Sequence, residues 1–217
     1  MNNQVEIEFA AELNGKEGRK PTFYFLQIRP IVALQEKNRV KIDLSRPEKF
    51  LLLSYQALGN GIIENICDII YVKPDAFNPA NTKSIASSIE KLNAEFVKAG
   101  KYYLLVGPGR WGSSDPWLGV PVKWSQISAA RLIVESGLKD YQIDPSQGTH
   151  FFQNLTSFNV GYFTINPHYN QGLYDLDSLG SQPAIFEDEH VRHVRFSKPL
   201  VIKIDGKKKI GAVYKPE

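Results

Sequence analysis

Residues 82–106 read TKSIASSIEKLNAEFVKAGKYYLLV, and this stretch decides the class of fold. Four apolar residues follow one another at spacings of four, three and four: Ile85, Ile89, Leu92 and Phe96. This spacing predicts an amphipathic helix over residues 82–98 with one apolar stripe. Gly100 is typical of a helix end, and the apolar run at residues 102–106 predicts a buried strand. The stretch therefore indicates a helix beside a sheet.

Strand-like segments lie on both sides of this helix. The runs that predict strands are residues 51–53, 62–72, 131–135, the region around 163, 200–204 and 210–214. Gly59-Asn60-Gly61 and Asp205-Gly206 predict turns, and residues 125–130 predict a short helix. The alternation of strands and helices predicts an α/β or mixed α+β domain over residues 50–217.

The composition is that of a globular protein. The chain has 217 residues, of which 42% are hydrophobic, so it can bury a substantial core. Its net charge of +3 is too small and too dispersed to argue for a nucleic-acid surface. No apolar run approaches the roughly 20 residues of a membrane span, and the single cysteine, Cys67, fits a reducing compartment. We expect a cytoplasmic protein with no nucleic-acid or membrane partner.

Residues 1–34 predict a β-hairpin, with alternating residues 5–9 as its first strand and residues 23–31 as its second. A two-stranded hairpin is marginally stable alone. The only methionine, Met1, comes just before the first strand, so we expect a piece excised from a longer protein. Residues 35–49 are charged and contain a proline, and they predict a linker.

Polar side chains of this hairpin form the first candidate site. Glu8, Gln27 and Arg29 lie on two strands that we expect to pair, and alternation puts Gln27 and Arg29 on one face. Mg²⁺ takes carboxylate and amide oxygens together with substrate phosphates, and a guanidinium suits a phosphate oxygen. The alternative is an ordinary solvated hairpin face.

The hairpin sequence resembles the end of the ATP-grasp nucleotide-binding domain of the phosphoenolpyruvate synthase and pyruvate phosphate dikinase family. The similar segments are VEIEF at residues 5–9 and FLQIRP at residues 25–30. The resemblance implies that Glu8 and Gln27 bind Mg²⁺ with ATP, and that Arg29 contacts phosphate. It also implies that most of the ATP-grasp domain lies outside this chain.

A histidine after a glycine turn forms the second candidate site. Residues 146–152 read SQGTHFF and lie between two strand-like runs, so we expect His150 near the start of a short helix. Backbone N–H groups at a helix start attract anions, and histidine can act as a nucleophile that forms a covalent intermediate. His150 is therefore a candidate phosphoryl carrier. The alternative is a helix-capping or hydrogen-bonded core histidine.

Several landmarks in residues 50–217 resemble the swivelling β/β/α domain of the same family, which carries a phosphohistidine. They are the glycine turn at residues 58–62, the segment Gly148-Thr149-His150 and the closing hairpin at residues 201–213. The resemblance implies that His150 is catalytic, that Gly148 and Thr149 shape its turn, and that a phosphoryl group passes from ATP to an acceptor such as pyruvate. The implied partner is the rest of the parent chain, with its ATP-grasp and acceptor-binding domains.

Residues 107–112, GPGRWG, fit the G-x-G-x-x-G dinucleotide fingerprint, with Glu135 at the place of the ribose-binding acid. The prolines that follow forbid the helix which this fingerprint must open. We therefore expect a rigid loop that presents Arg110, Trp111 and Trp117 to a ligand or to a neighbouring domain, with Arg110 holding an anion. A loop packed by its own tryptophans is the alternative.

Two further interpretations stay open. His190 and His193, with acids nearby, suggest a metal site, although their spacing alone gives weak support because no cysteine joins them. The second interpretation is a degenerate, non-catalytic swivel-like domain that mediates domain or subunit contacts. The aromatic loop at residues 107–124 and the bulky pair Phe151-Phe152 favour it.

Overall fold

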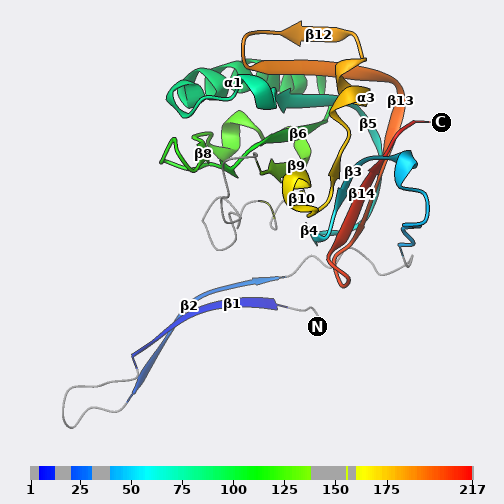
Figure 1. Ribbon diagram of the computed structural model, residues 1–217. Helices are drawn as coiled ribbons and strands as arrows, with labels where there is room; N and C mark the ends of the chain where they lie inside the picture. Colours follow the sequence, from blue (N-terminus) through cyan, green and yellow to red (C-terminus); the bar gives the residue numbers. More distant parts are fainter. Residues whose placement is uncertain (1–4, 13–20, 31–39, 138–154, 156–159, 217) are drawn as a thin grey trace. The chain divides into compact units, whose positions relative to one another are not determined.

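Helix α1 (Thr82–Ala99) forms where the apolar stripe predicts it, and it ends at Gly100, whose φ of 63° lies in the left-handed region. The four stripe residues are at most 5% exposed. The computed structural model describes residues 5–12, 21–30, 40–137, 155 and 160–216. They belong to two compact units, residues 1–37 and 38–217, and each is described by itself (Figure 1).

The second unit is a mixed α+β structure made mainly of strands. Its described residues form one ten-stranded sheet in the order β11-β3-β14-β13-β5-β6-β9-β10-β4, with β12 paired to β13. The strands are β3 (Phe50–Ser54), β4 (Gln56–Leu58), β5 (Asn60–Val72), β6 (Tyr103–Pro108), β9 (Ala130–Ser136), β10 (Gly161–Ile165), β11 (Leu173–Tyr174), β12 (Ala184–Glu187), β13 (Val191–Asp205) and β14 (Ile210–Tyr214).

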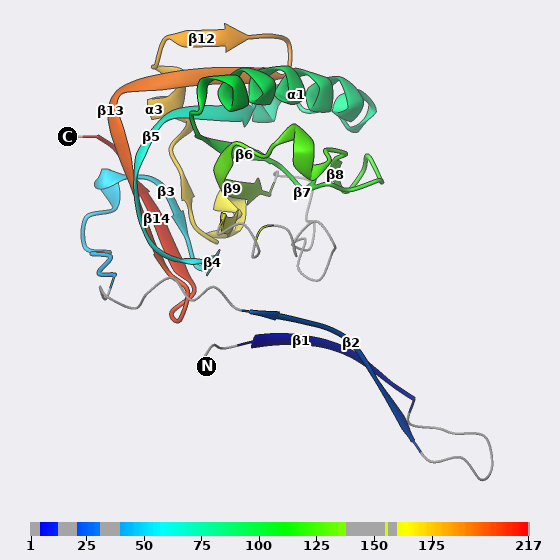
Figure 2. The same cartoon turned by 180° about the vertical axis from the view of Figure 1, so that it is seen from behind.

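The two ends of the sheet approach each other. Strands β5, β6, β9 and β10 run parallel to one another, and β10 pairs antiparallel with β4 while β14 pairs with β3. Only Tyr55 separates β3 from β4, and the Ser54 hydroxyl donates a hydrogen bond of 2.7 Å to the carbonyl of Thr164 on β10. The sheet is thus curled into an open barrel, in which no strand ladder among the described residues joins β3 or β11 to β4 or β10. Helix α1 lies along β5 and β13 in both views (Figures 1 and 2).

Neighbouring residues on the central strands face two different cores. On β6, Tyr103 and Leu105 pack in the layer that contains α1. Leu104 and Val106 pack in a second cluster, to which β5, β9, β10, β13 and β14 also contribute, and which fills the barrel. Because both faces of these strands are buried, their sequences are continuous apolar runs and do not alternate.

The short helix predicted for residues 125–130 is wrong, because only one 3-10 turn forms there, at Trp124–Gln126. The cause is Asn93 on α1. Its side-chain oxygen accepts the N–H of Ala129 at 3.0 Å, and its side-chain nitrogen donates to the carbonyl of Ser125 at 3.1 Å. These two backbone groups would have bonded each other in a helix.

The remaining short elements lie in the connections. They are β7 (Arg110–Trp111), β8 (Gly119–Val120), α3 (Leu176–Gly180), and 3-10 turns at Pro47–Lys49, Pro74–Ala76, Pro79–Asn81 and Pro167–Tyr169. No helix in the described part of the chain combines the length and the apolar character that crossing a lipid bilayer requires.

Residues 40–49, within the segment predicted as a linker, belong to the second unit. Val40 is only 8% exposed, and the N–H of Lys215 donates to the carbonyl of Lys49 at 2.9 Å. Lys203 on β13 reaches the carbonyl of Lys41 at 3.5 Å. This segment is therefore attached to β13 and to the end of β14.

The first unit is the predicted hairpin. Strand β1 (Val5–Glu12) pairs antiparallel with β2 (Thr22–Pro30), and the register shifts between Glu8 and Phe9. The rings of Phe9 and Phe23 stack with their centroids 4.9 Å apart. Even so, Phe9 is 57% exposed and Phe23 59% exposed, so the hairpin leaves its apolar side chains largely uncovered.

Candidate functional site

The register of the hairpin brings two predicted site residues together. Glu8 on β1 lies directly opposite Gln27 on β2, and Glu6 lies opposite Arg29 in the same ladder. Directly opposite residues of an antiparallel pair project from the same face, with Cβ atoms about 5 Å apart. The side chains of Glu8 and Gln27 are exposed. A carboxylate residue and an amide residue thus share one face of the hairpin, and whether they bind Mg²⁺ stays a prediction.

The predicted nucleophile falls outside the described residues. Strand β9 ends at Ser136 and β10 begins at Gly161, and His150, Gly148 and Thr149 lie between them in residues 138–154, which the structure does not describe. The prediction that His150 carries a phosphoryl group therefore stays a prediction.

A buried carboxylate lies at the carboxyl end of β9, close to the start of that segment in the sequence. Glu135 is 3% exposed. It accepts the backbone N–H of Trp111 at 3.1 Å and the hydroxyl of Tyr162 at 2.5 Å. The indole N–H of Trp111 donates to the carbonyl of Val134 at 3.0 Å. Glu135 thus links β7, β9 and β10 at one end of the parallel strands.

The loop that follows β6 is ordered by these contacts and by its own short ladder. Strand β7 pairs in parallel with β8, and the N–H of Arg110 donates to the carbonyl of Leu118 at 2.7 Å. The prediction that the loop presents both tryptophans is half wrong. Trp117 is 65% exposed, but Trp111 is 1% exposed because its ring fills the core beside Glu135. Arg110 is half-buried.

The dinucleotide interpretation of this loop fails on its structural context. Strand β6 leads into β7 and not into a helix, so the phosphate-binding helix start of that fold is missing here. The carboxylate of Glu135, at the place of the ribose-binding acid, already accepts two hydrogen bonds from protein groups.

A second buried carboxylate was not found from the sequence. Asp68 on β5 lies 2.7 Å from His193 Nε2 and 2.8 Å from Arg195 Nε, both on β13. Burial opposes the ionisation of Asp68, but the hydrogen bonds from His193 and Arg195 outweigh it and lower the pKa of its carboxyl group. Phe96 of α1 meets the imidazole edge-on at 5.3 Å. Asp68 lies within an apolar run, and no spacing pattern marks it as a partner of residues 125 positions away.

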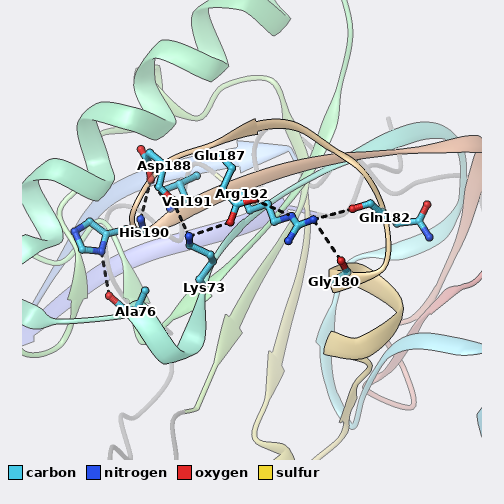
Figure 3. Close-up of polar contacts among 9 residues, drawn as sticks. All are labelled: Lys73, Ala76, Gly180, Gln182, Glu187, Asp188, His190, Val191 and Arg192. Atoms are coloured by element: carbon cyan, nitrogen blue, oxygen red, sulfur yellow. Dashed lines mark hydrogen bonds and ion pairs between the residues drawn. The ribbon is translucent and has the colours of Figure 1, made fainter.

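The pair His190 and His193 does not form a metal site. Figure 3 shows the ring of His190 directed to Ala76, whose carbonyl lies 3.0 Å from Nδ1. His193 bonds Asp68 instead. Within the described residues, no group of three or more His, Cys, Asp or Glu side chains is placed to hold a metal ion.

The acids near His190 have structural partners. Asp188 accepts the N–H groups of His190 and Val191 at 2.8 and 2.6 Å. Glu187 lies 3.1 Å from Lys73 Nζ and 3.5 Å from Arg192 Nε (Figure 3). These contacts fasten β12 and the turn before β13 to the end of β5. The acids near His190 therefore serve to attach the edge strand β12 to the rest of the sheet.

Comparison with protein families, with curated proteins and with solved structures finds no match for this chain.

Proposed function

We propose that the chain is part of an ATP-dependent phosphotransferase resembling phosphoenolpyruvate synthase. In this proposal, residues 1–34 are the final hairpin of an ATP-grasp domain, and residues 50–217 are a swivelling domain that carries a phosphoryl group on His150. The observation that carries the proposal is the direct cross-strand pairing of Glu8 with Gln27. That pairing puts the two residues singled out by the resemblance on a shared face of the hairpin.

The residues of the hairpin fit a magnesium–nucleotide complex. Mg²⁺ is usually held by one or two protein oxygens, with phosphate oxygens and water completing its shell. Glu8 and Gln27 would supply these two protein oxygens, and Arg29 would contact a phosphate. When bound, the ion would neutralise phosphate charge, and further ATP-grasp strands would enclose the nucleotide.

The proposed chemistry is a two-step phosphoryl relay. A neutral imidazole nitrogen of His150 forms an N–P bond as the P–O bond to the departing part of ATP breaks. In the second step, an oxygen of the acceptor, such as pyruvate, forms a bond to phosphorus and the N–P bond breaks. Most of the catalysis in phosphoryl transfer comes from positioning and from charge neutralisation. The curled ten-stranded sheet with α1 along it is compatible with a rigid carrier for such a histidine.

Phosphohistidine formation tests the proposal. The full-length protein that contains this chain is incubated with Mg²⁺ and with ATP labelled at the β or the γ phosphate, with and without pyruvate. We expect a label on the protein that is acid-labile and base-stable, and that His150→Ala abolishes. His168→Ala is the matched control, because His168 is an exposed histidine on another loop and should leave the label intact. Absence of the label under every acceptor condition rejects the proposal.

A non-catalytic, swivel-like domain that mediates domain or subunit contacts is the second candidate function. One observation favours it: Trp117 is 65% exposed on a loop whose neighbouring residues are fixed by β7 and β8. An exposed tryptophan on a rigid loop suits a protein contact. This candidate predicts no phosphohistidine, together with weaker domain or subunit association in Trp117→Ala than in the matched exposed-aromatic control Tyr169→Ala.

A further inference from the structure

A basic pocket lies between residues 41–49 and the β13–β14 hairpin. It has a volume of about 600 Å³, within the range of small-molecule sites. Five of its lining side chains are basic and one is acidic; the basic ones are Lys41, Arg46, Lys49, Lys203 and Lys208. In both views, β14 lies on the opposite side of the barrel from β8, so the pocket is distinct from the loop that holds Trp117 (Figures 1 and 2).

The basic side chains of this pocket outnumber the carboxylates near them. Among the described residues, none of Lys41, Arg46 and Lys203 has a carboxylate oxygen within 4.0 Å. The one acid in the lining, Asp43, accepts the N–H and the hydroxyl of Ser45 at 3.0 and 2.6 Å. These bonds, with the nearby charges of Arg46 and Lys49, lower the pKa of its carboxyl group, so Asp43 offsets one of the five positive charges. Lys208 lies 3.7 Å from Asp205, and it is mostly exposed.

The pocket walls are fixed by the fold. The Nζ of Lys203 lies 3.5 Å from the carbonyl of Lys41 and 5.1 Å from the centre of the Tyr214 ring. Lys49 is held to the strand end by the bond from the N–H of Lys215. The Lys203 ammonium and the backbone of residues 41 and 49 are thus held in place, and the five basic residues line one pocket, where their mutual repulsion favours an anion.

We propose that this pocket binds a small phosphorylated molecule with two or three linked phosphate groups. A single phosphate carries about two negative charges at neutral pH, fewer than the excess of three that the five basic side chains keep over Asp43 and Asp205. A di- or triphosphate supplies several acceptor oxygens for ammonium and guanidinium donors. The volume leaves room for such a chain and for an organic group against Ile42 and Tyr214. This site is independent of the proposed magnesium–nucleotide site on the hairpin.

Binding of inorganic tripolyphosphate to the 217-residue chain tests the proposal, with phosphate and pyrophosphate as comparisons and EDTA present to remove Mg²⁺. We expect saturable one-site binding in calorimetry at low salt, with affinity rising from phosphate to tripolyphosphate. Amide NMR shifts should concentrate in residues 41–49, 203–208 and 214. Absence of saturation by about 10 mM, far weaker than the micromolar affinity expected of a built site, overturns the proposal. So do shifts that centre elsewhere, or tighter binding of a poly-glutamate peptide or an oligonucleotide.

Two double variants, each of which removes two positive charges, test whether the anion binds in this pocket. Lys41→Gln/Arg46→Gln should weaken tripolyphosphate binding about tenfold or more, since charge-assisted hydrogen bonds contribute the larger energies among hydrogen bonds. Lys83→Gln/Lys98→Gln removes the same charge from the exposed face of α1 and should change affinity less than about twofold at moderate salt, because distant surface charges are screened. Equal losses in the two double variants overturn the proposal. Lys203→Gln tests the same pocket from β13 if the first pair fails to fold.

Discussion

The hydroxyl of Tyr162 donates a hydrogen bond of 2.5 Å to the Glu135 carboxylate and so joins β10 to β9. The other oxygen of the same carboxylate accepts the N–H of Trp111 at the start of the 107–120 loop. The side chains of Glu135 and Tyr162 are at most 3% exposed. One buried carboxyl group therefore fixes the relative positions of two strands of the sheet and a loop.

Tyr162→Phe removes this bond while keeping the ring in the core. We expect the free energy of unfolding to fall by about 1–3 kcal/mol, because a buried carboxylate loses one donor. Urea denaturation followed by circular dichroism measures the change. The control is Tyr169→Phe, which removes a hydroxyl from a residue that is 48% exposed and should cost less than about 0.5 kcal/mol. Equal decreases in the free energy of unfolding for the two variants would show that the hydrogen bond between Tyr162 and Glu135 does not stabilise the fold.

Gly119→Ala should break the ladder between β7 and β8. A Cβ atom at this position would lie 1.9 Å from the Arg110 carbonyl oxygen, and φ is +153°. We expect a loss of at least about 2 kcal/mol, since backbone has to move. Thermal unfolding gives the measurement. Gly180→Ala is the control, because a Cβ there meets nothing within 4 Å. If both variants unfold at the wild-type temperature, the loop is not held as the structure shows.

The sequence predicts most of the secondary structure because its strongest signals are local. The apolar stripe correctly predicts α1, and the apolar runs correctly predict β5, β6 and β9. These predictions succeed because burial of one or both faces of an element gives a recognisable apolar pattern in the sequence. The order of the strands in the sheet is not predicted from the sequence. It depends on which strands pair, and the pairing of β4 with β10 joins residues about a hundred positions apart.

The candidate sites show the same difference between features that neighbouring residues determine and features that depend on contacts distant in the sequence. Alternation predicts the two strands of the hairpin, which form, but the register that puts Glu8 opposite Gln27 comes from the structure alone. The prediction that Trp111 is presented at the surface is wrong because its burial depends on β9, where Val134 and Glu135 accept its hydrogen bonds. The basic pocket was missed because its cations come from two separate segments of the chain, one of them predicted as a linker.

Asp68 should make the stability of the fold depend on pH in the acid range. Its folded pKa lies below the ordinary value of 3.8 because bonds from His193 and Arg195 outweigh the effect of burial. On acidification, the unfolded chain therefore takes up this proton first. The stabilisation is fully present above the unfolded pKa of about 3.9, and it is lost as pH falls through the folded value.

Asp68→Asn isolates that contribution. We expect the free energy of unfolding at pH 7 to fall by about 2 kcal/mol. This is less than for a fully buried ion pair, because Arg195 is 42% exposed. The difference from the unmodified chain should shrink as the pH falls below about 4. Urea denaturation at a series of pH values measures it. Asp177→Asn, at an exposed position, should cost less than about 0.5 kcal/mol at pH 7. A difference that stays constant down to pH 2.5 would contradict the assignment to Asp68.

Glu8→Gln should raise the Mg²⁺ concentration needed for histidine labelling, provided that the proposed phosphotransfer occurs. The variant replaces a charged oxygen ligand with a neutral one at the position opposite Gln27. Loss of groups that merely support a metal ligand typically costs 10–100-fold in affinity, so we expect at least about a tenfold increase. Titration of Mg²⁺ at fixed labelled ATP gives the half-maximal concentration. Glu12→Gln makes the same change on the same strand, where the partner is Thr22, and should leave that concentration unaltered. A common shift in both variants would mean that hairpin charge, and not a ligand at residue 8, sets the magnesium dependence.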